Sequence, residues 1–284
     1  MKWFCALLLF CITLPAAAAR TVTDQLGRTV QVPDHPHRLV CLMPSVVDDV
    51  YALGAGADVI AVTDYTKYPA EARTKPSVGS ILSPSMETIL SLHPDLVLGS
   101  ADMSQTETLQ QLERLGITVF MVSTHGVDGI YQSITSIGLA LNREDSAREL
   151  VAKLRGREAA VRRQVSGKPV MSILMPVGYN PIVTIGKHAF ITELIEIAGG
   201  HSVTGDIDQE WPQVSLEAVL ARAPEALLLI RDSRMSIERI REQPGWSSLP
   251  AVKNNRVYYV DDRINLPSPV AFVALEELAK QFHP

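Results

Sequence analysis

The sequence predicts an α/β protein whose two halves resemble each other and are joined by one long helix. Short apolar stretches of strand type alternate with longer helical patterns, which is typical of parallel sheets flanked by helices. A charged amphipathic segment at 144–165 separates the two halves. A helix-and-strand pattern that begins at Ser85 returns at Ser215, an offset of 215 − 85 = 130 residues. These three observations set the fold class.

Eight short apolar runs are predicted as strands, four in each half. Residues 22–32 precede them and are predicted to form a small hairpin. The strands are expected at 39–42, 59–63, 96–99 and 118–122 in the first half, and at 170–175, 182–185, 226–230 and 256–260 in the second.

The segment 144–165 carries apolar residues at helical spacing among many charges and contains no proline. Such a pattern predicts an amphipathic helix, interrupted only mildly by Gly156. The stretch Ser166-Gly167-Lys168-Pro169 then supplies a stop signal. We therefore expect a rigid connection between two lobes. The predicted boundaries are 1–19 for a signal peptide, 20–142 for the first lobe, 143–166 for the linking helix and 167–284 for the second lobe.

The repeated pattern lies at 85–98 and 215–228. Each copy begins with a serine suited to cap a helix, has an acid in the first turn, and continues through a proline-acid turn into an apolar strand. A weaker repeat is a helical pattern that ends at a glycine, Gly54 in one half and Gly199 in the other. The two lobes are therefore predicted to be equivalent in structure.

The chain begins with a stretch of secretory-signal type. Lys2 precedes the apolar run 3–12, which is followed by Pro15 and four alanines. The run is shorter than the roughly 20 residues that span a bilayer. Cleavage after Ala19 would leave 284 − 19 = 265 residues with 25 basic and 31 acidic side chains. This acidic balance argues against nucleic-acid binding, and we expect a soluble, monomeric protein in the periplasm.

Cysteine usage agrees with this interpretation. Cys5 and Cys11 would leave with the signal, so that only Cys41 remains, and no internal disulfide is expected. Large residues rather than small ones precede Cys11, which is the wrong context for a lipoprotein cleavage site. Cys41 lies in an apolar run and is predicted to be a buried strand residue.

Motifs of the common hydrolases, nucleotide-binding proteins and metalloproteases are absent from the sequence. The seven histidines include no pair at the i, i+4 spacing of helical metal ligands. An enzyme on a two-lobed architecture, such as a tetrapyrrole metal chelatase, would need convergent histidine and carboxylate groups. The sequence offers no such cluster, and we expect no enzyme activity, no resident cofactor and no metal site.

Several stretches resemble the periplasmic substrate-binding proteins of ABC importers for cobalamin, haem and iron-siderophores. They are T-V-T-D-Q-L-G-R-T-V (21–30), P-H-R-L-V-C-L-M-P-S (36–45), L-S-L-H-P-D-L-V-L (90–98), T-I-G-K-H-A-F (184–190), A-G-G-H-S-V (198–203) and W-P-Q-V-S-L-E-A-V-L-A-R-A-P (211–224). The last is most similar to the cobalamin-binding members. The resemblance implies two Rossmann-like lobes joined by one long helix, with the ligand in the cleft between them.

The resemblance also gives a role to the two repeated acids, Glu87 and Glu217. A single glutamate in the first turn of a helix is explained by the helix dipole. Two at matching positions can present one charge from each lobe on a common face. In the family these positions dock onto arginines of the membrane permease, and exposed ion pairs of this kind fix register and speed encounter. We therefore expect an ABC permease as the partner.

Ligand contacts are expected at strand ends and the loops that follow them. In the cobalamin-binding relative, the positions of Tyr65, Trp211 and Asp262 line the pocket. Aromatic faces suit a flat macrocycle because they bury area at low entropic cost. The full set of predicted ligand-binding residues is Ser45, Tyr65, Tyr68, Tyr179, Lys187, Trp211, Asp262 and Arg263.

The expected ligand is a corrinoid, but other positions keep haem and a ferric siderophore as alternatives. Ile81 and Ser100 stand where the cobalamin-binding relative has tryptophans, and Val177 replaces another aromatic residue. A siderophore would favour a basic pocket for an anionic chelate. Residues that can provide one are Arg231, Arg234 and Arg263.

Overall fold

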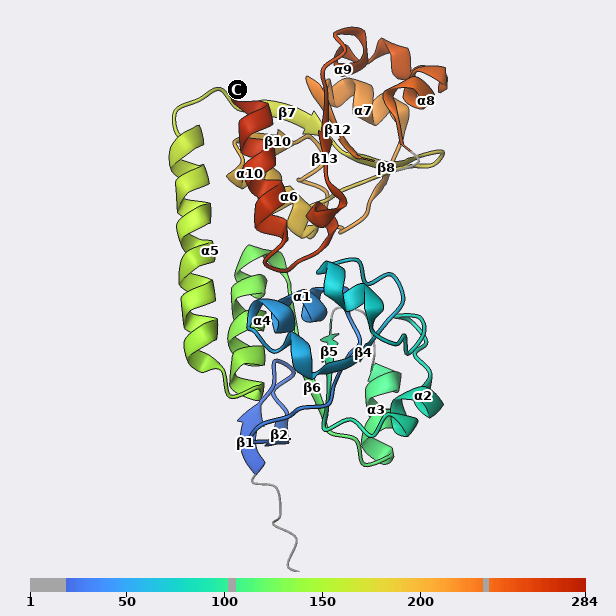
Figure 1. Ribbon diagram of the computed structural model, residues 1–284. Helices are drawn as coiled ribbons and strands as arrows, with labels where there is room; N and C mark the ends of the chain where they lie inside the picture. Colours follow the sequence, from blue (N-terminus) through green and yellow to red (C-terminus); the bar gives the residue numbers. More distant parts are fainter. Residues whose placement is uncertain (1–18, 102–105, 232–234) are drawn as a thin grey trace, which may run out of the picture.

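The computed structural model describes residues 19–101, 106–231 and 235–284. It has two lobes, one above the other in Figure 1, with α5 (Glu144–Val165) running along one side of both. The fold class predicted from the sequence is confirmed. The predicted signal segment lies outside the described residues except for Ala19, which opens strand β1 of a small hairpin. This antiparallel hairpin is formed by β1 (Ala19–Thr23) and β2 (Thr29–Pro33).

The first lobe is built on a four-stranded parallel sheet with the order β4-β3-β5-β6. Its strands are covered on both faces, which explains why they appear in the sequence as continuous apolar runs. In β3, for example, all three residues are buried. All four strands predicted for this half are present. They are β3 (Leu39–Cys41), β4 (Val59–Val62), β5 (Leu96–Ser100) and β6 (Val119–Val122).

The second lobe repeats this sheet. Its order is β10-β7-β12-β13, again all parallel, so that in both lobes the strands follow the order second, first, third, fourth. The prediction that the lobes are equivalent is confirmed at the level of topology. The strands are β7 (Met171–Leu174), β10 (Gly200–Ser202), β12 (Ala226–Ile230) and β13 (Val257–Val260).

The strand predicted at 182–185 exists as β9 (Ile182–Thr184), but it does not join the parallel sheet. It pairs antiparallel with β8 (Pro176–Tyr179) and β11 (Gln213–Val214) in a separate three-stranded sheet. The second position in the parallel sheet is taken by β10, which the sequence did not indicate. Because β10 is only three residues long and reads Gly-His-Ser, it has no apolar run that marks it as a strand.

The repeated helices have the local structure that the sequence predicts. Ser85 caps α2 (Met86–Ser91) by accepting a hydrogen bond from the backbone N–H of Thr88. Ser215 caps α7 (Leu216–Arg222) in the same way, with the N–H of Ala218 as donor. The strands that follow these helices begin at residues 96 and 226, again 130 apart. The repeat therefore reflects structurally equivalent positions.

The remaining helices cover the sheets. Gly54 and Gly199 adopt positive φ of 76° and 82° just after α1 and α6, as expected for helix stops. The helices are α1 (Pro44–Ala52), α3 (Thr106–Arg114), α4 (Gly126–Ala140), α6 (Phe190–Ile197), α8 (Ile237–Glu242), α9 (Pro250–Lys253) and α10 (Ala271–Phe282).

Three helices meet where the lobes join. The ring of Tyr131 on α4 faces the ring of Phe272 on α10, with centroids 5.8 Å apart. From α5, the guanidinium groups of Arg155 and Arg157 lie over these rings, at 4.3 Å and 5.9 Å respectively. The hydroxyl of Tyr131 donates to Glu158 at 2.7 Å. Helix α5 is thus attached to both lobes by packing as well as by the chain.

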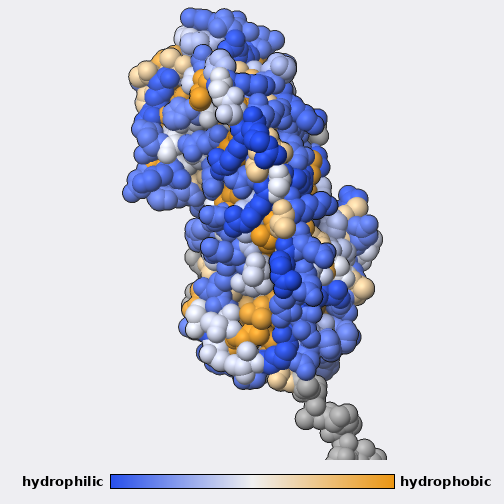
Figure 2. Space-filling view, turned by 90° about the vertical axis from the view of Figure 1, so that its left-hand side faces the viewer, coloured by the Kyte–Doolittle hydropathy of each residue, from blue (hydrophilic) through white to orange (hydrophobic). Residues whose placement is uncertain are grey.

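Helix α5 carries many charged residues, and the side of the molecule along which it runs is mostly hydrophilic in Figure 2, with smaller hydrophobic areas. Its apolar side chains Ala147, Leu154 and Val161 are buried against the lobes. Cys41 is fully buried in β3, as predicted, and burial raises the pKa of its thiol to about 12. No helix in the described ranges is both long enough and apolar enough to cross a bilayer.

Candidate functional site

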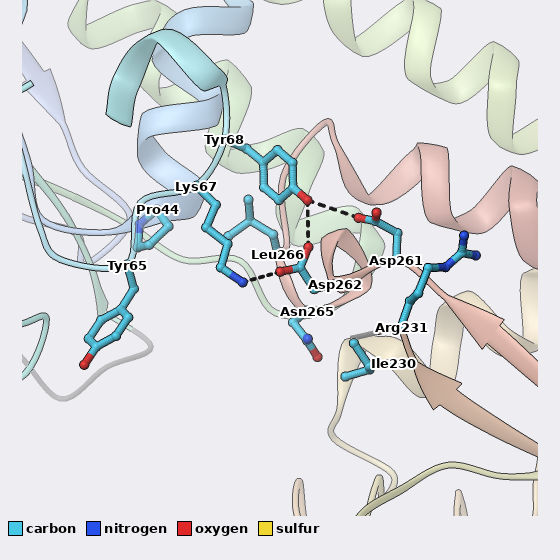
Figure 3. A pocket seen from close by; sticks show the side chains of 10 residues that line it. All are labelled: Pro44, Tyr65, Lys67, Tyr68, Ile230, Arg231, Asp261, Asp262, Asn265 and Leu266. Carbon is cyan, nitrogen blue, oxygen red and sulfur yellow. Dashed lines mark hydrogen bonds and ion pairs between the residues drawn. The ribbon is translucent and has the colours of Figure 1, made fainter. Parts of the chain in front are cut away.

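A cavity of about 610 Å³ lies between the two lobes, within the range of about 300–1,000 Å³ that is usual for small-molecule sites. The first lobe contributes residues from the start of α1 and from the loop after β4. The second contributes the end of β12 and the short helix η5 (Asp262–Asn265) with its neighbours. The lining residues, drawn in Figure 3, are Pro44, Tyr65, Lys67, Tyr68, Ile230, Arg231, Asp261, Asp262, Asn265 and Leu266.

Polar contacts cross the cavity from one lobe to the other. The Nζ atom of Lys67 lies 2.5 Å from Oδ2 of Asp262. The hydroxyl of Tyr68 donates to Oδ1 of Asp262 at 2.7 Å and to Oδ1 of Asp261 at 3.2 Å. These side chains point toward one another in Figure 3. Residues separated by more than 190 positions in the chain therefore form one polar cluster.

This cluster has a defined electrostatic state. Burial, the hydrogen bond to Asp262 and the charges of both aspartates raise the pKa of the Tyr68 hydroxyl, which is therefore a stable donor at neutral pH. Burial alone would raise the pKa of Asp261, but hydrogen bonds from Arg263 and its positive charge outweigh burial and lower it. The Nε atom of Arg263 lies 2.6 Å from Oδ1 of Asp261. Asp261 is therefore ionised under physiological conditions.

Tyr65 stands apart from this cluster with 80% of its surface exposed. Its φ of 67° lies in the left-handed region, which costs energy for a residue with a side chain. A large aromatic side chain that a strained backbone holds in solvent does not stabilise the fold by burial. Such strain is found most often at ligand-binding sites.

The structure brings together three of the predicted ligand-binding residues, Tyr65, Tyr68 and Asp262, in the wall of this cavity. Arg263 lies next to the wall and pairs with Asp261. Ser45 is buried in the first turn of α1 with 2% exposure and does not line the cavity.

The other predicted ligand-binding residues lie on or near the small antiparallel sheet. Tyr179 ends β8 and is half-buried. Lys187 follows β9 and its Nζ lies 3.4 Å from Asp208. Trp211 precedes β11 and is 44% exposed. None of the three lines the cavity between the lobes.

The cavity also contains residues that the sequence did not indicate, chiefly Lys67, Asp261 and Asn265. Lys67 lies between the two tyrosines of the predicted set, and Asp261 lies next to Asp262, so proximity in the chain is the only signal for them. Arg231 also lines the cavity, and its guanidinium lies 2.6 Å from Glu277. Arg234 lies outside the described residues.

Glu87 and Glu217 are exposed in the first turns of α2 and α7. Both helices lie on the side of the molecule away from α5 (Figure 1). Hydrogen bonds from its own backbone N–H and from Ser215 lower the pKa of Glu217. Within the described part of the chain, neither glutamate forms an ion pair.

Metal-ligating groups do not gather in the described residues: no set of three or more His, Cys, Asp or Glu side chains there has the arrangement of a metal site. The described lining of the cavity contains no histidine or cysteine. What the arrangement provides is an aromatic surface, two carboxylates and paired cations around a space between two lobes, which suits binding of a small molecule.

Comparisons with known proteins agree with this geometry. A family model described as periplasmic binding protein matches residues 39–264. An uncharacterized ABC transporter substrate-binding lipoprotein, YvrC of Bacillus subtilis (strain 168), is 31% identical over 273 residues, which cover 93% of this chain and 85% of that protein. The vitamin B12-binding protein of Vibrio campbellii (strain ATCC BAA-1116) is 26% identical over 247 residues, which cover 86% and 89% of the two chains.

Among solved structures, the periplasmic heme-binding protein RhuT of Roseiflexus sp. RS-1, in its apo form, has a TM-score of 0.79 at 27% identity. The match covers 87% of this chain and 98% of that chain. Members of the matched family bind small molecules and work with ABC transporter permeases. The length of the family match and the similarity to YvrC show that this chain belongs to the periplasmic binding protein family.

Proposed function

We propose that this protein captures a corrinoid in the cavity between its lobes and delivers it to an ABC permease from the periplasm. The observation that carries the choice of ligand is the charge state of the cavity. Each cation in or beside the described wall is already paired with a carboxylate. The pairs are Lys67 with Asp262, Arg231 with Glu277 and Arg263 with Asp261.

A wall without excess positive charge favours a ligand with a neutral periphery. Haem propionates and most ferric siderophores are anionic and would require unpaired arginine or lysine side chains. The rim of a corrin ring carries amide groups, which both donate and accept hydrogen bonds. Asp261, Asp262 and Asn265 can accept or exchange hydrogen bonds with such amides, and the ring of Tyr65 can cover the flat face of the macrocycle.

Haem is the second candidate, because the RhuT structure is similar and because tyrosine can ligate ferric iron. Tyr68 is a poor iron ligand since burial and its two aspartate neighbours hold the proton on its hydroxyl. Tyr65 is exposed and free to approach a metal. A haem complex would therefore depend on the hydroxyl of Tyr65, whereas stacking on a corrinoid would not.

Titration of the protein that begins at Arg20 tests the ligand. Cyanocobalamin, dicyanocobinamide, hemin and the anionic tris-catecholate ferric enterobactin are added separately, and binding is measured by calorimetry. We expect both corrinoids to bind more tightly than hemin or ferric enterobactin, and Tyr65→Phe to bind corrinoids as the wild type does. Hemin binding that is lost in Tyr65→Phe would identify haem, not a corrinoid, as the ligand. Binding of ferric enterobactin alone would favour the siderophore.

We also propose that Glu87 and Glu217 dock the loaded protein onto its permease. They are exposed, lie at equivalent positions in the two lobes, and have no ion-pair partner in the described chain. A pair of carboxylates held at the ends of two rigid helices can engage two separate cationic sites and so fix the orientation of the protein on a membrane partner.

The double variant Glu87→Ala/Glu217→Ala is expected to bind ligand with unchanged affinity but to lose most uptake in cells that carry the cognate permease. Glu107 and Glu238 offer a matched control, because each lies in the first turn of an exposed helix, one in each lobe, outside the repeat. Glu107→Ala/Glu238→Ala should transport normally. Full uptake by the first variant would contradict docking through these acids, as would equal losses in both.

A further inference from the structure

Two carboxylates accept hydrogen bonds from groups of the opposite lobe. The first is Asp48 on α1, which is 9% exposed. Its Oδ2 atom accepts a hydrogen bond from Oγ of Ser268 at 2.8 Å and another from the backbone N–H of Val270 at 3.0 Å. Ser268 and Val270 immediately precede α10 in the other lobe. Asp48 therefore caps the first turn of a helix that belongs to the opposite lobe.

The second carboxylate is that of Glu193 on α6. Its Oε2 atom accepts a hydrogen bond from the backbone N–H of Val127 at 2.7 Å, in the first turn of α4 in the first lobe. Gly126 leaves room for this approach, because a Cβ atom at that position would lie 2.8 Å from Oε2 of Glu193. Gly126 also has a φ of 68°, which a side chain would disfavour.

The two contacts are equivalent under the internal repeat of the protein. Helices α1 and α6 each lie between the first and second strands of their own parallel sheet, and α4 and α10 each follow the fourth strand. Asp48 lies six residues before the helix stop Gly54 (54 − 48), and Glu193 lies six before Gly199 (199 − 193). In each lobe, a carboxylate at the equivalent position therefore contacts the N-terminus of the equivalent helix in the other lobe.

Both contacts place a carboxylate at the N-terminus of a helix, where it is stabilised. A carboxylate at the N-terminus of a helix satisfies free N–H groups and interacts with the positive end of the helix dipole. Both receiving helices, of 15 and 12 residues, point their N-termini at the opposite lobe in Figure 1. Burial raises the pKa of Asp48, while the hydrogen bonds from Ser268 and Val270 lower it in part. Removing either carboxylate leaves a backbone donor unpaired between the lobes.

We propose that Asp48 and Glu193 are reciprocal interlobe caps that set the width of the ligand cleft, and hence are positioning residues for ligand capture. Pro44, one helical turn before Asp48, lines the cavity from one lobe. Leu266, two residues before Ser268, lines it from the other. The contact at Asp48 therefore holds both walls of the cavity in register. Only its effect on ligand affinity rests on the proposed function; the effect on lobe separation does not.

Pulsed electron–electron double resonance measures the distance between two spin labels, and so tests the proposed effect on lobe separation without any ligand. Spin labels are placed at Leu82→Cys and Val177→Cys, exposed positions in the two lobes. Cys41 does not interfere because its thiol is buried and its pKa is raised to about 12. When either carboxylate is removed, we expect the distribution of label-to-label distances to become broader and to shift to longer distances. Glu193→Ala removes one charge-assisted hydrogen bond and should increase the open population about tenfold. Asp48→Ala removes two and should increase it at least as much, and the double variant more than either.

Conservative variants separate capping from simple packing. Asp48→Asn and Glu193→Gln keep a carbonyl oxygen as acceptor and should restore most of the narrow distribution. Gly126→Ala keeps both acids but pushes Glu193 away, and should open the lobes like Glu193→Ala. If Asp48→Ala does not fold, Glu193→Ala and Gly126→Ala still carry the test. A second label pair, Leu82→Cys with Leu115→Cys, lies within one lobe and should not change.

An unchanged distribution in Asp48→Ala/Glu193→Ala would overturn the proposal, as would an amide variant that opens as far as the alanine variant. The corrinoid titration is a separate readout. If the variants open but the wild type binds no corrinoid, the caps stand and the ligand assignment fails. If the wild type binds corrinoid and the variants neither open nor lose affinity, the caps fail and the ligand assignment stands.

Discussion

Replacing Phe272 by alanine is expected to lower the free energy of unfolding by about 3–5 kcal/mol, the usual cost of deleting a buried aromatic ring. Phe272 is fully buried at the start of α10. Its ring packs on Tyr131 of the other lobe and lies beneath the guanidinium of Arg157. The cavity left by the ring would be bordered by three helices that are anchored elsewhere, so these helices cannot collapse onto it fully.

The position of Phe272 adds a second effect. Since its ring is shared by both lobes and α5, its loss also weakens the coupling between the lobes, and calorimetry should resolve a broader or double transition where the wild type gives one. Urea unfolding gives the free energy. Phe272→Leu is the matched control and is expected to cost less than about 1.5 kcal/mol because it nearly conserves volume. A loss under about 1 kcal/mol for the alanine variant would contradict the role of this junction.

Tyr65→Gly is expected to weaken corrinoid binding by about 10- to 100-fold, the effect of losing an aromatic anchor worth about 2 kcal/mol. The free energy of unfolding of this variant should not fall. At a φ of 67° a glycine releases about 1–2 kcal/mol of backbone strain, which offsets the roughly 0.5–1 kcal/mol of extra chain entropy that glycine loses on folding. Affinity is measured by calorimetry and stability by urea unfolding on the same preparation.

Ala223→Gly is the control for Tyr65→Gly. Ala223 also has positive φ, 44°, but lies exposed at the end of α7, away from the cavity. It should gain stability in the same way and bind ligand as the wild type does. If Tyr65→Gly keeps full affinity, the exposed ring is not a ligand contact. If it loses several kcal/mol of stability, the ring has a structural role that its exposure does not reveal.

Much of the fold could be predicted from the sequence because the signals were local and strong. The helix at 144–165 has a long amphipathic pattern and a clear stop, and its bounds agree with α5. The repeat at 85–98 and 215–228 predicted equivalent lobes. The strand β10 was missed and β9 was placed in the wrong sheet. In both cases the strand has three residues, and its partners are chosen by tertiary contacts rather than by periodicity.

The candidate site could be predicted only in part. Tyr65 and Asp262 were predicted through a family resemblance, and Tyr68 through its place in a loop after a strand. Both signals report the position of a residue but not its neighbours. The contacts of Lys67 and Tyr68 with Asp262 join positions 194 or 195 residues apart and leave no pattern in the sequence. The interlobe role of Asp48 was missed, although one signal exists: it is an acid in the apolar stretch Val46-Val47-Asp48-Asp49-Val50, where a charge must find a partner.

The reciprocal contacts of Asp48 and Glu193 also give this single chain the symmetry of a dimer. Two identical subunits related by a twofold axis form each contact of their interface twice, with the partners exchanged. The two lobes share one strand order, and each supplies a carboxylate to a helix N-terminus of the other. They are therefore arranged as the subunits of such a dimer would be, with α5 as the covalent connection between them. The ligand cavity lies where a homodimer would have its interface.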